Sequence, residues 1–196
     1  MATLMVNNTF IYDDNFLSEK EIQEIEDLFN SNSNKWMYSE VSIQSDHQEY
    51  ETIVSSEQFG DSQYFVLYPE HQDNAYKLCE KVINRFTEKH KVKYNQLLRV
   101  KLNMTPSGAG PIVTYPHIDD TNPHYIFLYY VNDSQGDTII YNETYNGSKI
   151  DDVSVMTRIS PKRGSAFIID GRHFHSLTVP NNGDLRRVIN ANLFYI

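Results

Sequence analysis

The chain has 196 residues, of which 26 are acidic and 17 basic, and this length favours one domain with a substantial core. The formal charge of −9 argues against sequence-independent binding to nucleic acid and favours a basic or neutral substrate. The chain has a single cysteine, so no internal disulfide can form and a reducing compartment is favoured. The N-terminus shows no signal-peptide pattern, and no apolar run is long enough to span a bilayer. We therefore expect a cytoplasmic protein with no membrane partner.

A helix is predicted near the start of the chain, after a short strand candidate at residues 6–12. Ser18 and Glu21 have the spacing of a capping box, in which each residue satisfies a backbone N–H of the other. Apolar side chains then recur at helical spacing up to the polar stretch 30–34, which is expected to end the helix.

A second helix is predicted over residues 73–90, where apolar side chains again recur every three or four positions. Cys79 falls within this pattern and is expected to be a packed thiol rather than a nucleophile. Residues 36–43 and 62–69 look extended. The polar segment 44–62 between them reads as a long surface loop, and such loops are often lids over binding sites.

From residue 95 onward the chain consists of short runs rich in β-branched and aromatic residues, separated by Gly, Pro, Asn and Asp. Two helices followed by many strands indicate an α+β chain, with a two-sheet jelly-roll or barrel that has the N-terminal helices packed on one sheet. The strand candidates are LLRVKLNM (97–104), YIFLYYVN (125–132), DTIIYNE (137–143), VMTRIS (155–160), GSAFIID (164–170) and RRVINANLFYI (186–196).

A metal site is indicated by the segment 115–120, which reads Tyr-Pro-His-Ile-Asp-Asp. His117 and Asp119 are two residues apart, so in extended backbone both side chains point to one face. One imidazole from a later strand would complete the two-histidine, one-carboxylate set of non-haem Fe(II) oxygenases. His173 and His175 are two residues apart, so in a strand the side chain of either could face the site. We prefer His175, because a small polar residue and a turn proline follow it.

Three other residues near these positions are interpreted differently. Asp120 is out of phase with the His-x-Asp pair and is expected to be solvated or to cap the next turn. His124 is a candidate for a lid or a supporting position, and Glu143 for a supporting or structural role. A Ser-His-Asp hydrolase is excluded by the lack of a Gly-x-Ser-x-Gly elbow, and a structural zinc site by the lack of cysteines.

A family resemblance emerges from an ordered set of motifs: PHIDD, IFLYYVND, GDTIIYNE, PKRGSAFIIDGRHFHSLTVP and RRVINANLFY. Together they resemble the 2-oxoglutarate and Fe(II) dependent dioxygenases, and especially the prolyl 4-hydroxylase-like branch. The resemblance covers about residues 95–196. It implies a double-stranded β-helix, so we expect one oxygenase domain over residues 1–196, with a mainly helical part to about 94 and the jelly-roll catalytic core from about 95.

The same resemblance implies that His117, Asp119 and His175 bind Fe(II). It also implies that O2 and 2-oxoglutarate are consumed, that succinate and CO2 are released, and that a C–H bond is hydroxylated, with ascorbate as a reductant. The protein would supply metal geometry, a dry cavity and substrate orientation.

A basic residue in the last strand would hold the distal carboxylate of 2-oxoglutarate by paired hydrogen bonds. Of two adjacent arginines we favour Arg187, whose sequence RVINANL fits the last strand of the family best, with Arg186 as the alternative. Tyr129 falls where the family often has a tyrosine that reaches the same carboxylate, and an ordinary core aromatic is the competing interpretation.

The leading substrate hypothesis is a prolyl residue in a protein or peptide, with free amino acids and other small molecules left open. Nucleic acid is not expected. An alternative from another class is a non-catalytic, cupin-like jelly-roll protein that binds a sugar or peptide. A third is an iron dioxygenase that uses no keto acid.

Overall fold

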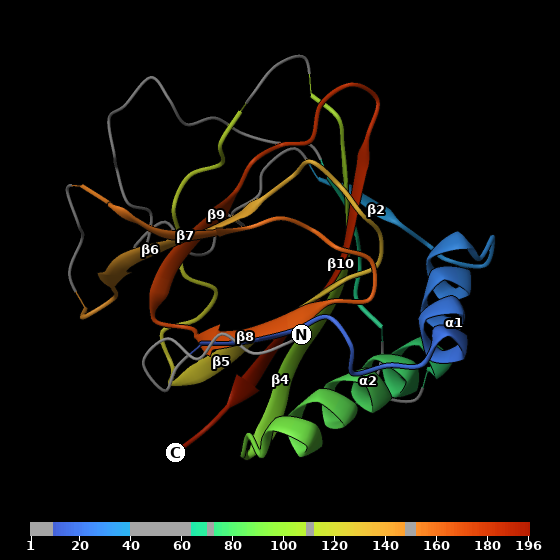
Figure 1. Cartoon of the computed structure of the whole chain (residues 1–196), viewed down its shortest axis with the longest axis horizontal. Coiled ribbons are helices and arrows are strands. Elements are labelled where there is room, and N and C mark those ends of the chain that lie inside the picture. Colours follow the sequence, from blue (N-terminus) through green and yellow to red (C-terminus); the bar gives the residue numbers. More distant parts are fainter. Residues whose placement is uncertain (1–9, 40–63, 70–72, 109–111, 148–151) are drawn as a thin grey trace.

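Two antiparallel β-sheets lie face to face in this computed structural model (Figure 1). The larger sheet has seven strands in the order β1-β8-β5-β10-β4-β3-β2, and the smaller has three in the order β7-β6-β9. The strands are β1 (Phe10–Asp13), β2 (Met37–Ser39), β3 (Tyr64–Leu67), β4 (Gln96–Pro106), β5 (His124–Tyr130), β6 (Thr138–Thr144), β7 (Val155–Ile159), β8 (Ala166–Asp170), β9 (His173–Leu177) and β10 (Leu185–Phe194).

The structure describes residues 10–39, 64–69, 73–108, 112–147 and 152–196. The predicted loop at 44–62 and the first part of the strand candidate at 6–12 lie outside these ranges. The strands predicted after residue 95 are confirmed, each within a few residues of its expected bounds.

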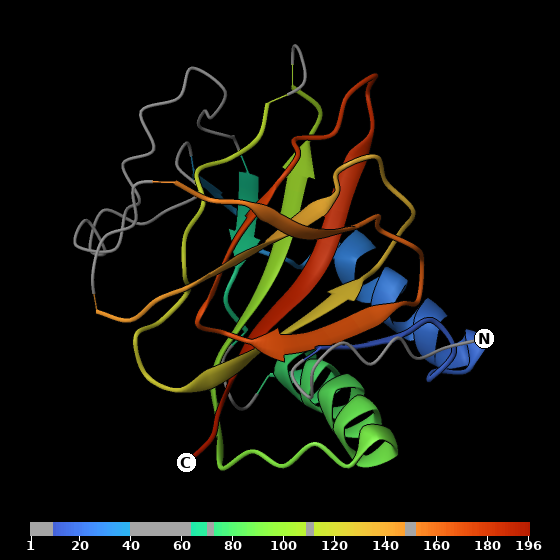
Figure 2. The ribbon, with the colours of Figure 1, turned by 60° about the vertical axis from the view of Figure 1, so that its left-hand side comes forward.

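Helices α1 (Glu19–Asn30) and α2 (Asn74–His90) pack on the outer face of the larger sheet (Figures 1 and 2). The predicted capping box starts α1, since Ser18 N–H donates to Glu21 Oε2 (2.9 Å) and Glu21 N–H donates to Ser18 Oγ (3.4 Å). In α2, Cys79 is fully buried, and burial raises the pKa of its thiol to about 12. Both predicted helices are confirmed, and neither has the length and apolar character needed to cross a membrane.

The N-terminal elements belong to the same sheet as the later strands. β1 pairs with β8 at one edge, and β3 pairs with β4 toward the other. The larger sheet therefore takes strands from both sides of residue 94. The expected α+β jelly-roll with helices on one sheet is confirmed.

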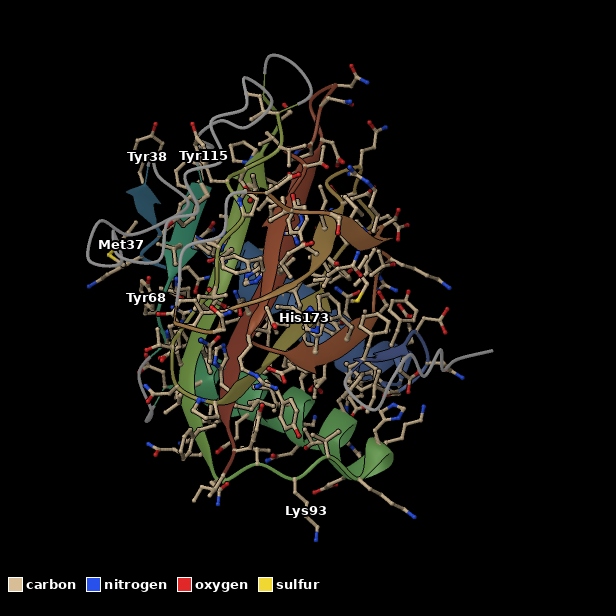
Figure 3. The ribbon with its side chains drawn as sticks, turned by 90° about the vertical axis from the view of Figure 1, so that its left-hand side faces the viewer. Met37, Tyr38, Tyr68, Lys93, Tyr115 and His173 are labelled. Carbon is tan, nitrogen blue, oxygen red and sulfur yellow. The ribbon has the colours of Figure 1, made fainter. Side chains whose placement is uncertain are left out.

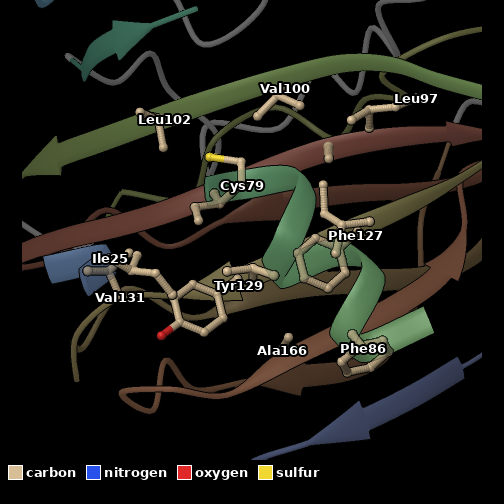
Figure 4. Packing of buried hydrophobic residues seen from close by; sticks show 14 of the residues in the cluster. Ile25, Cys79, Phe86, Leu97, Val100, Leu102, Phe127, Tyr129, Val131 and Ala166 are labelled. Atoms are coloured by element: carbon tan, nitrogen blue, oxygen red, sulfur yellow. The ribbon is translucent and has the colours of Figure 1, made fainter. Parts of the chain in front are cut away.

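Side chains of β5 and β10 alternate between two layers, as strand geometry requires. One set faces α1 and α2 and forms the helix-facing core (Figure 4), which includes Phe127, Tyr129, Ile189, Ala191 and Leu193. The other set faces the smaller sheet and includes Ile126, Leu128, Tyr130 and Val188. The phase of a residue in its strand thus decides whether its side chain joins the helix-facing core or enters the space between the sheets.

Candidate metal centre

The three predicted metal ligands come together between the two sheets. His117 and Asp119 lie in the segment before β5, and His175 lies on β9. One ligand atom from each side chain lies within 4.8 Å of the others. His117 and His175 form an antiparallel β-bridge, with N···O distances of 3.0 and 2.9 Å, and Asp119 follows two residues later on the same face.

Backbone carbonyls orient both imidazoles. His117 Nδ1 lies 3.0 Å from the Tyr115 carbonyl oxygen, and His175 Nδ1 lies 3.3 Å from that of His173. Because a carbonyl oxygen can only accept, each Nδ1 holds the hydrogen and each Nε2 keeps its lone pair. This is the orientation typical of histidines that bind a metal.

The larger sheet holds Asp119 in its ionised form. Arg99 Nη2 on β4 lies 2.9 Å from Asp119 Oδ1, and Asn190 Nδ2 on β10 donates to Oδ2 at 3.3 Å. Burial by itself would raise the pKa of Asp119, but the Arg99 guanidinium, helped by the Lys101 ammonium, holds that pKa well below its usual range. The site therefore contains a fixed carboxylate.

The two imidazoles are neutral. Burial lowers the pKa of His117, and burial together with neighbouring His117 lowers the pKa of His175 to about 3, although Asp119 opposes both shifts. Metal binding requires neutral imidazoles. Two such imidazoles and one carboxylate fit a non-haem Fe(II) centre with positions open to other ligands.

The three ligands line a pocket between the sheets. It encloses about 780 Å³ of space not filled by protein atoms, part of which is open to solvent. Its walls are mostly apolar between the metal ligands and Arg186. Other lining residues are Tyr64, Lys101, Asn103, Thr105, Ile126, Leu128, Thr138, Ile140, Phe167, Ile169, Ser176, Leu177, Val188 and Asn190.

Arg186 is a buried cation in this pocket, 4 % exposed. Its Nε donates to the Gly136 carbonyl oxygen (2.9 Å), its Nη2 donates to Thr138 Oγ1 (2.8 Å), and its guanidinium lies 5.6 Å from the centre of the Tyr130 ring. Within the described ranges no acidic side chain forms a salt bridge with it, and burial lowers its pKa. The Asp137 carboxylate opposes this shift but forms no salt bridge with Arg186. Burying a charge without a direct ion-pair partner is costly, so this guanidinium favours an anion bound in the pocket.

Thr138 adds a second donor beside Arg186. Its oxygen accepts hydrogen bonds from Arg186 and from Tyr130 Oη (2.7 Å). A hydroxyl has two lone pairs and one hydrogen, so with both lone pairs used the Thr138 hydrogen is left for an acceptor in the pocket. A guanidinium and a hydroxyl that line the same pocket suit a carboxylate.

The structure places the side chains of Arg187 and Tyr129 outside the pocket. The Arg187 side chain lies on the helix side of the sheet, where its Nη1 donates to Asn30 Oδ1 (3.3 Å). Tyr129 is fully buried in the helix-facing core (Figure 4), with its ring 6.1 Å from that of Phe16. Both residues are one position out of phase with the pocket, which instead receives Arg186 from β10 and is flanked by Tyr130 from β5.

One sequence signal would have identified the pocket face of β10. Asn190 and Asn192 are in phase with Arg186, whereas the alternate positions in phase with Arg187 are apolar. β4 shows the same alternation. Its pocket-phase side chains, which sequence reasoning missed, are Arg99, Lys101, Asn103 and Thr105.

The two other histidine candidates stand apart from the ligand set. His173 is partly exposed, and its Nδ1 lies 2.9 Å from the Tyr141 carbonyl oxygen. His124 is fully buried on β5, and within the described ranges its Nε2 has no hydrogen-bond partner. Its ring occupies the place that a Cβ at Gly171 would take, so a glycine is needed at that turn.

The two remaining acidic candidates have local structural roles. Asp120 Oδ1 accepts from the Asn122 backbone N–H (2.8 Å) and side-chain amide (2.9 Å), so it caps the following turn as expected. Glu143 accepts from the backbone N–H (2.8 Å) and hydroxyl (2.7 Å) of Ser154. Its contacts are therefore those of a structural residue.

No protein-family model and no curated protein matches the sequence. Among solved structures, the chain is similar to a prolyl hydroxylase from Trichoplax adhaerens in complex with a hypoxia inducible factor peptide, at a TM-score of 0.62 and 15 % identity, over 96 % of this chain and 84 % of that one. A 2OG-Fe(II) oxygenase family protein from Burkholderia pseudomallei matches at a TM-score of 0.64 and 8 % identity, over 95 % and 86 % of the two chains.

A third similar structure is the α-ketoglutarate dependent epimerase SnoN from nogalamycin biosynthesis, at a TM-score of 0.64 and 10 % identity, over 95 % of this chain and 78 % of that one. At these identities the likeness is one of fold. The chain has the double-stranded β-helix of these oxygenases.

Proposed function

We propose that this chain, which has the fold of the 2-oxoglutarate-Fe(II) oxygenases, is a 2-oxoglutarate-dependent dioxygenase that hydroxylates a C–H bond. The main support is that one pocket contains both a two-histidine, one-carboxylate set and the unneutralised cation of Arg186. A metal and a dicarboxylate together would satisfy these two ends of the pocket.

His117, Asp119 and His175 would hold Fe(II). Bound iron supplies the activation of O2 that couples oxidative decarboxylation of 2-oxoglutarate, giving succinate and CO2, to substrate hydroxylation. Arg99 and Asn190 fix the carboxylate of Asp119, and the backbone carbonyls described above fix both imidazoles.

Arg186 and the Thr138 hydroxyl would bind the distal carboxylate of 2-oxoglutarate. This assigns to Arg186 the role that sequence reasoning preferred for Arg187, and to Tyr130 a supporting contact in place of Tyr129. Ile126, Leu128 and Val188 would exclude water beside the bound co-substrate. A SnoN structure of the same fold contains Fe3+ and α-ketoglutarate.

The substrate is a peptide or a small molecule. Among the similar proteins, the prolyl hydroxylase was solved with a peptide, whereas SnoN was solved with nogalamycin RO. Ascorbate would serve as a reductant. The non-catalytic cupin-like alternative is not favoured, because it leaves the buried charge of Arg186 without a role.

Anaerobic titration with Fe(II) and then 2-oxoglutarate tests the proposal. We expect a weak visible charge-transfer band, followed on admission of air by O2 consumption and succinate release. Iron binding with neither band nor succinate would support the binding-protein alternative. O2 consumption that does not depend on 2-oxoglutarate would support a dioxygenase that uses no keto acid.

A further inference from the structure

Lys101 is a second cation in the pocket, on the β4 face that also bears Arg99 and Asn103. Its Nζ lies 5.6 Å from the centre of the Tyr68 ring. In the part of the chain that the structure describes, Lys101 forms no salt bridge. The Asp119 carboxylate attracts the Lys101 ammonium but is itself paired with Arg99 at 2.9 Å. Burial, with Arg99 nearby, lowers the pKa of Lys101 to about 8.

The charges of the pocket do not balance. Its lining contains two cationic side chains, Lys101 and Arg186, and one carboxylate, Asp119, which Arg99 also neutralises. A divalent metal would add two positive charges and 2-oxoglutarate two negative ones. The loaded pocket would therefore remain positive. A positive pocket would favour an anionic ligand despite the chain's net charge of −9, in contrast to the basic or neutral substrate expected from composition.

Lys101 and Arg186 lie at different places along the pocket. Across the sheet Lys101 pairs with Asn190, the residue that donates to Asp119, whereas Arg186 is four residues from Asn190 along β10, about 13 Å at the usual rise. Arg186 would take one carboxylate of 2-oxoglutarate and the metal the other. The ammonium group of Lys101 is then left for a different molecule.

An unused acceptor lies next to Lys101 on the same face of β4. Asn103 Oδ1 is buried and has no hydrogen-bond partner among the described residues. It is two residues from Lys101, so the two side chains project from one strand face about 7 Å apart along the strand. A ligand that satisfies both would present an anionic group and an N–H donor. Tyr68 lies on the same side of the molecule as Tyr38 and Tyr115 (Figure 3).

We infer that Lys101 binds a carboxylate of the primary substrate while Asn103 accepts an N–H from it, so that the substrate is a free amino acid or an acidic residue of a peptide. Both sources offer a carboxylate and a nearby N–H. The inference rests on the proposed function, because it assigns the second carboxylate subsite of the same pocket.

The test uses the full chain with Fe(II) and 2-oxoglutarate under anaerobic conditions, titrated calorimetrically. The probes are the free L-amino acids and their C-terminal amides, and end-blocked Ala-Glu-Ala and Ala-Gln-Ala. Wild type is compared with Lys101→Met and with Lys93→Met, which removes an exposed lysine far from the pocket (Figure 3).

We expect wild type and Lys93→Met to bind at least one carboxylate about tenfold or more tightly than its amide, and Lys101→Met to lose that preference while 2-oxoglutarate affinity stays within about twofold. Preference for free amino acids identifies a small-molecule substrate, and preference for Ala-Glu-Ala a peptide. No carboxylate preference in wild type, an unchanged preference in Lys101→Met, or an equal loss of 2-oxoglutarate affinity overturns the inference.

Failure of the proposed function gives a different result. If iron and 2-oxoglutarate yield no succinate in air and the Lys101-dependent carboxylate preference persists, the second subsite stands and the oxygenase assignment fails. If succinate is released but no Lys101-dependent carboxylate preference is found, the oxygenase assignment stands and the second subsite fails.

Discussion

His117 and His175 are hydrogen-bonded to each other through their backbones, N–H to carbonyl in both directions at 3.0 and 2.9 Å, and their ring centres lie 4.5 Å apart. The bridge joins the segment before β5 to β9 of the smaller sheet. The separation of two metal ligands is therefore set by strand pairing, which holds a site more accurately than a loop does.

Replacing Asp119 with Ala should abolish iron retention. The change removes one of three ligands and leaves Arg99 without its carboxylate. Fe(II) affinity should fall by more than the roughly 10–100-fold that changes beside a ligand set cost, and succinate release should stop. Asp120→Ala is the matched control, since Asp120 only caps a turn. Turnover of 2-oxoglutarate by Asp119→Ala would show that the site is elsewhere.

Arg186→Met should raise the 2-oxoglutarate concentration needed for half-maximal succinate release by about 100-fold, because a charged hydrogen bond is worth about 1.5–3 kcal/mol and Arg186 offers more than one. Arg187→Met should leave that concentration unchanged, since Arg187 contacts Asn30 outside the pocket. Thermal unfolding of both variants controls for misfolding, and Arg186→Lys, which restores the charge alone, should recover part of the loss. The reverse ranking of the two arginines would return the role to Arg187.

The adjacent tyrosines should also differ. Tyr130→Phe removes the hydrogen bond to Thr138 Oγ1, and we expect 2-oxoglutarate affinity to fall about fivefold, corresponding to about 1 kcal/mol. Tyr129→Phe removes a buried hydroxyl for which the described residues offer no partner, so it should change neither affinity nor activity. Competition with an unreactive 2-oxoglutarate analogue measures both effects, and equal losses would contradict the assignment.

Gly136→Ala should weaken 2-oxoglutarate binding without touching any charge. A Cβ at this position would lie 2.8 Å from Arg186 Cδ and 2.9 Å from the Thr178 carbonyl oxygen. The backbone oxygen cannot easily move, so Arg186 must shift, at a cost of about 1–3 kcal/mol for overpacking. Gly183→Ala is not a suitable control, because Gly183 has a positive φ of 77°. An unaltered 2-oxoglutarate affinity in Gly136→Ala would mean that Arg186 tolerates displacement.

The Asp13 carboxylate should stabilise the fold in a pH-dependent way. It contacts Lys89 Nζ (2.7 Å), His90 Nε2 (2.7 Å) and the Asn15 N–H (2.8 Å). Burial would raise its pKa, but the hydrogen bonds from Lys89, Asn15 and His90 lower it below the usual 3.8. Because the folded-state pKa is the lower one, the stabilisation is complete above about pH 4 and is lost as pH falls through the folded-state pKa.

Asp13→Asn should therefore lower the free energy of unfolding by about 1–3 kcal/mol at pH 7, and by less at pH 3. Urea unfolding at pH 7, 5 and 3 measures the difference. Equal destabilisation at pH 7 and pH 3 would show that packing, not the charge, makes the contribution.

Helices and strands could be predicted from the sequence because their signals are local. The Ser18 and Glu21 pair marks the start of α1, and apolar periodicity marks the rest. The His-x-Asp pair is local too. The proximity of His175 to His117 is not local, since it depends on a bridge between segments 58 residues apart. It was inferred from the residues that follow His175 and then from the family resemblance.

The sequence preference for Arg187 did not anticipate that Arg186 lines the pocket, for a different reason. The preference followed a motif alignment, whereas the deciding signal was the alternation of asparagine and apolar residues in β10. Lys101 was missed because residues 97–104 were identified only as a strand, and the alternation of Val100, Leu102 and Met104 with polar side chains was not used.

The two sheets meet at the metal site through different ligands. Asp119 is tied to β4 and β10 of the larger sheet, and His175 belongs to β9 of the smaller. A bound ion would therefore join the two layers at that end of the sandwich. Protein stripped by chelators should exchange the amide hydrogens of β9 faster and be cut there more readily by proteases, so the metal content of a preparation should determine the local stability of this end of the fold as well as its activity.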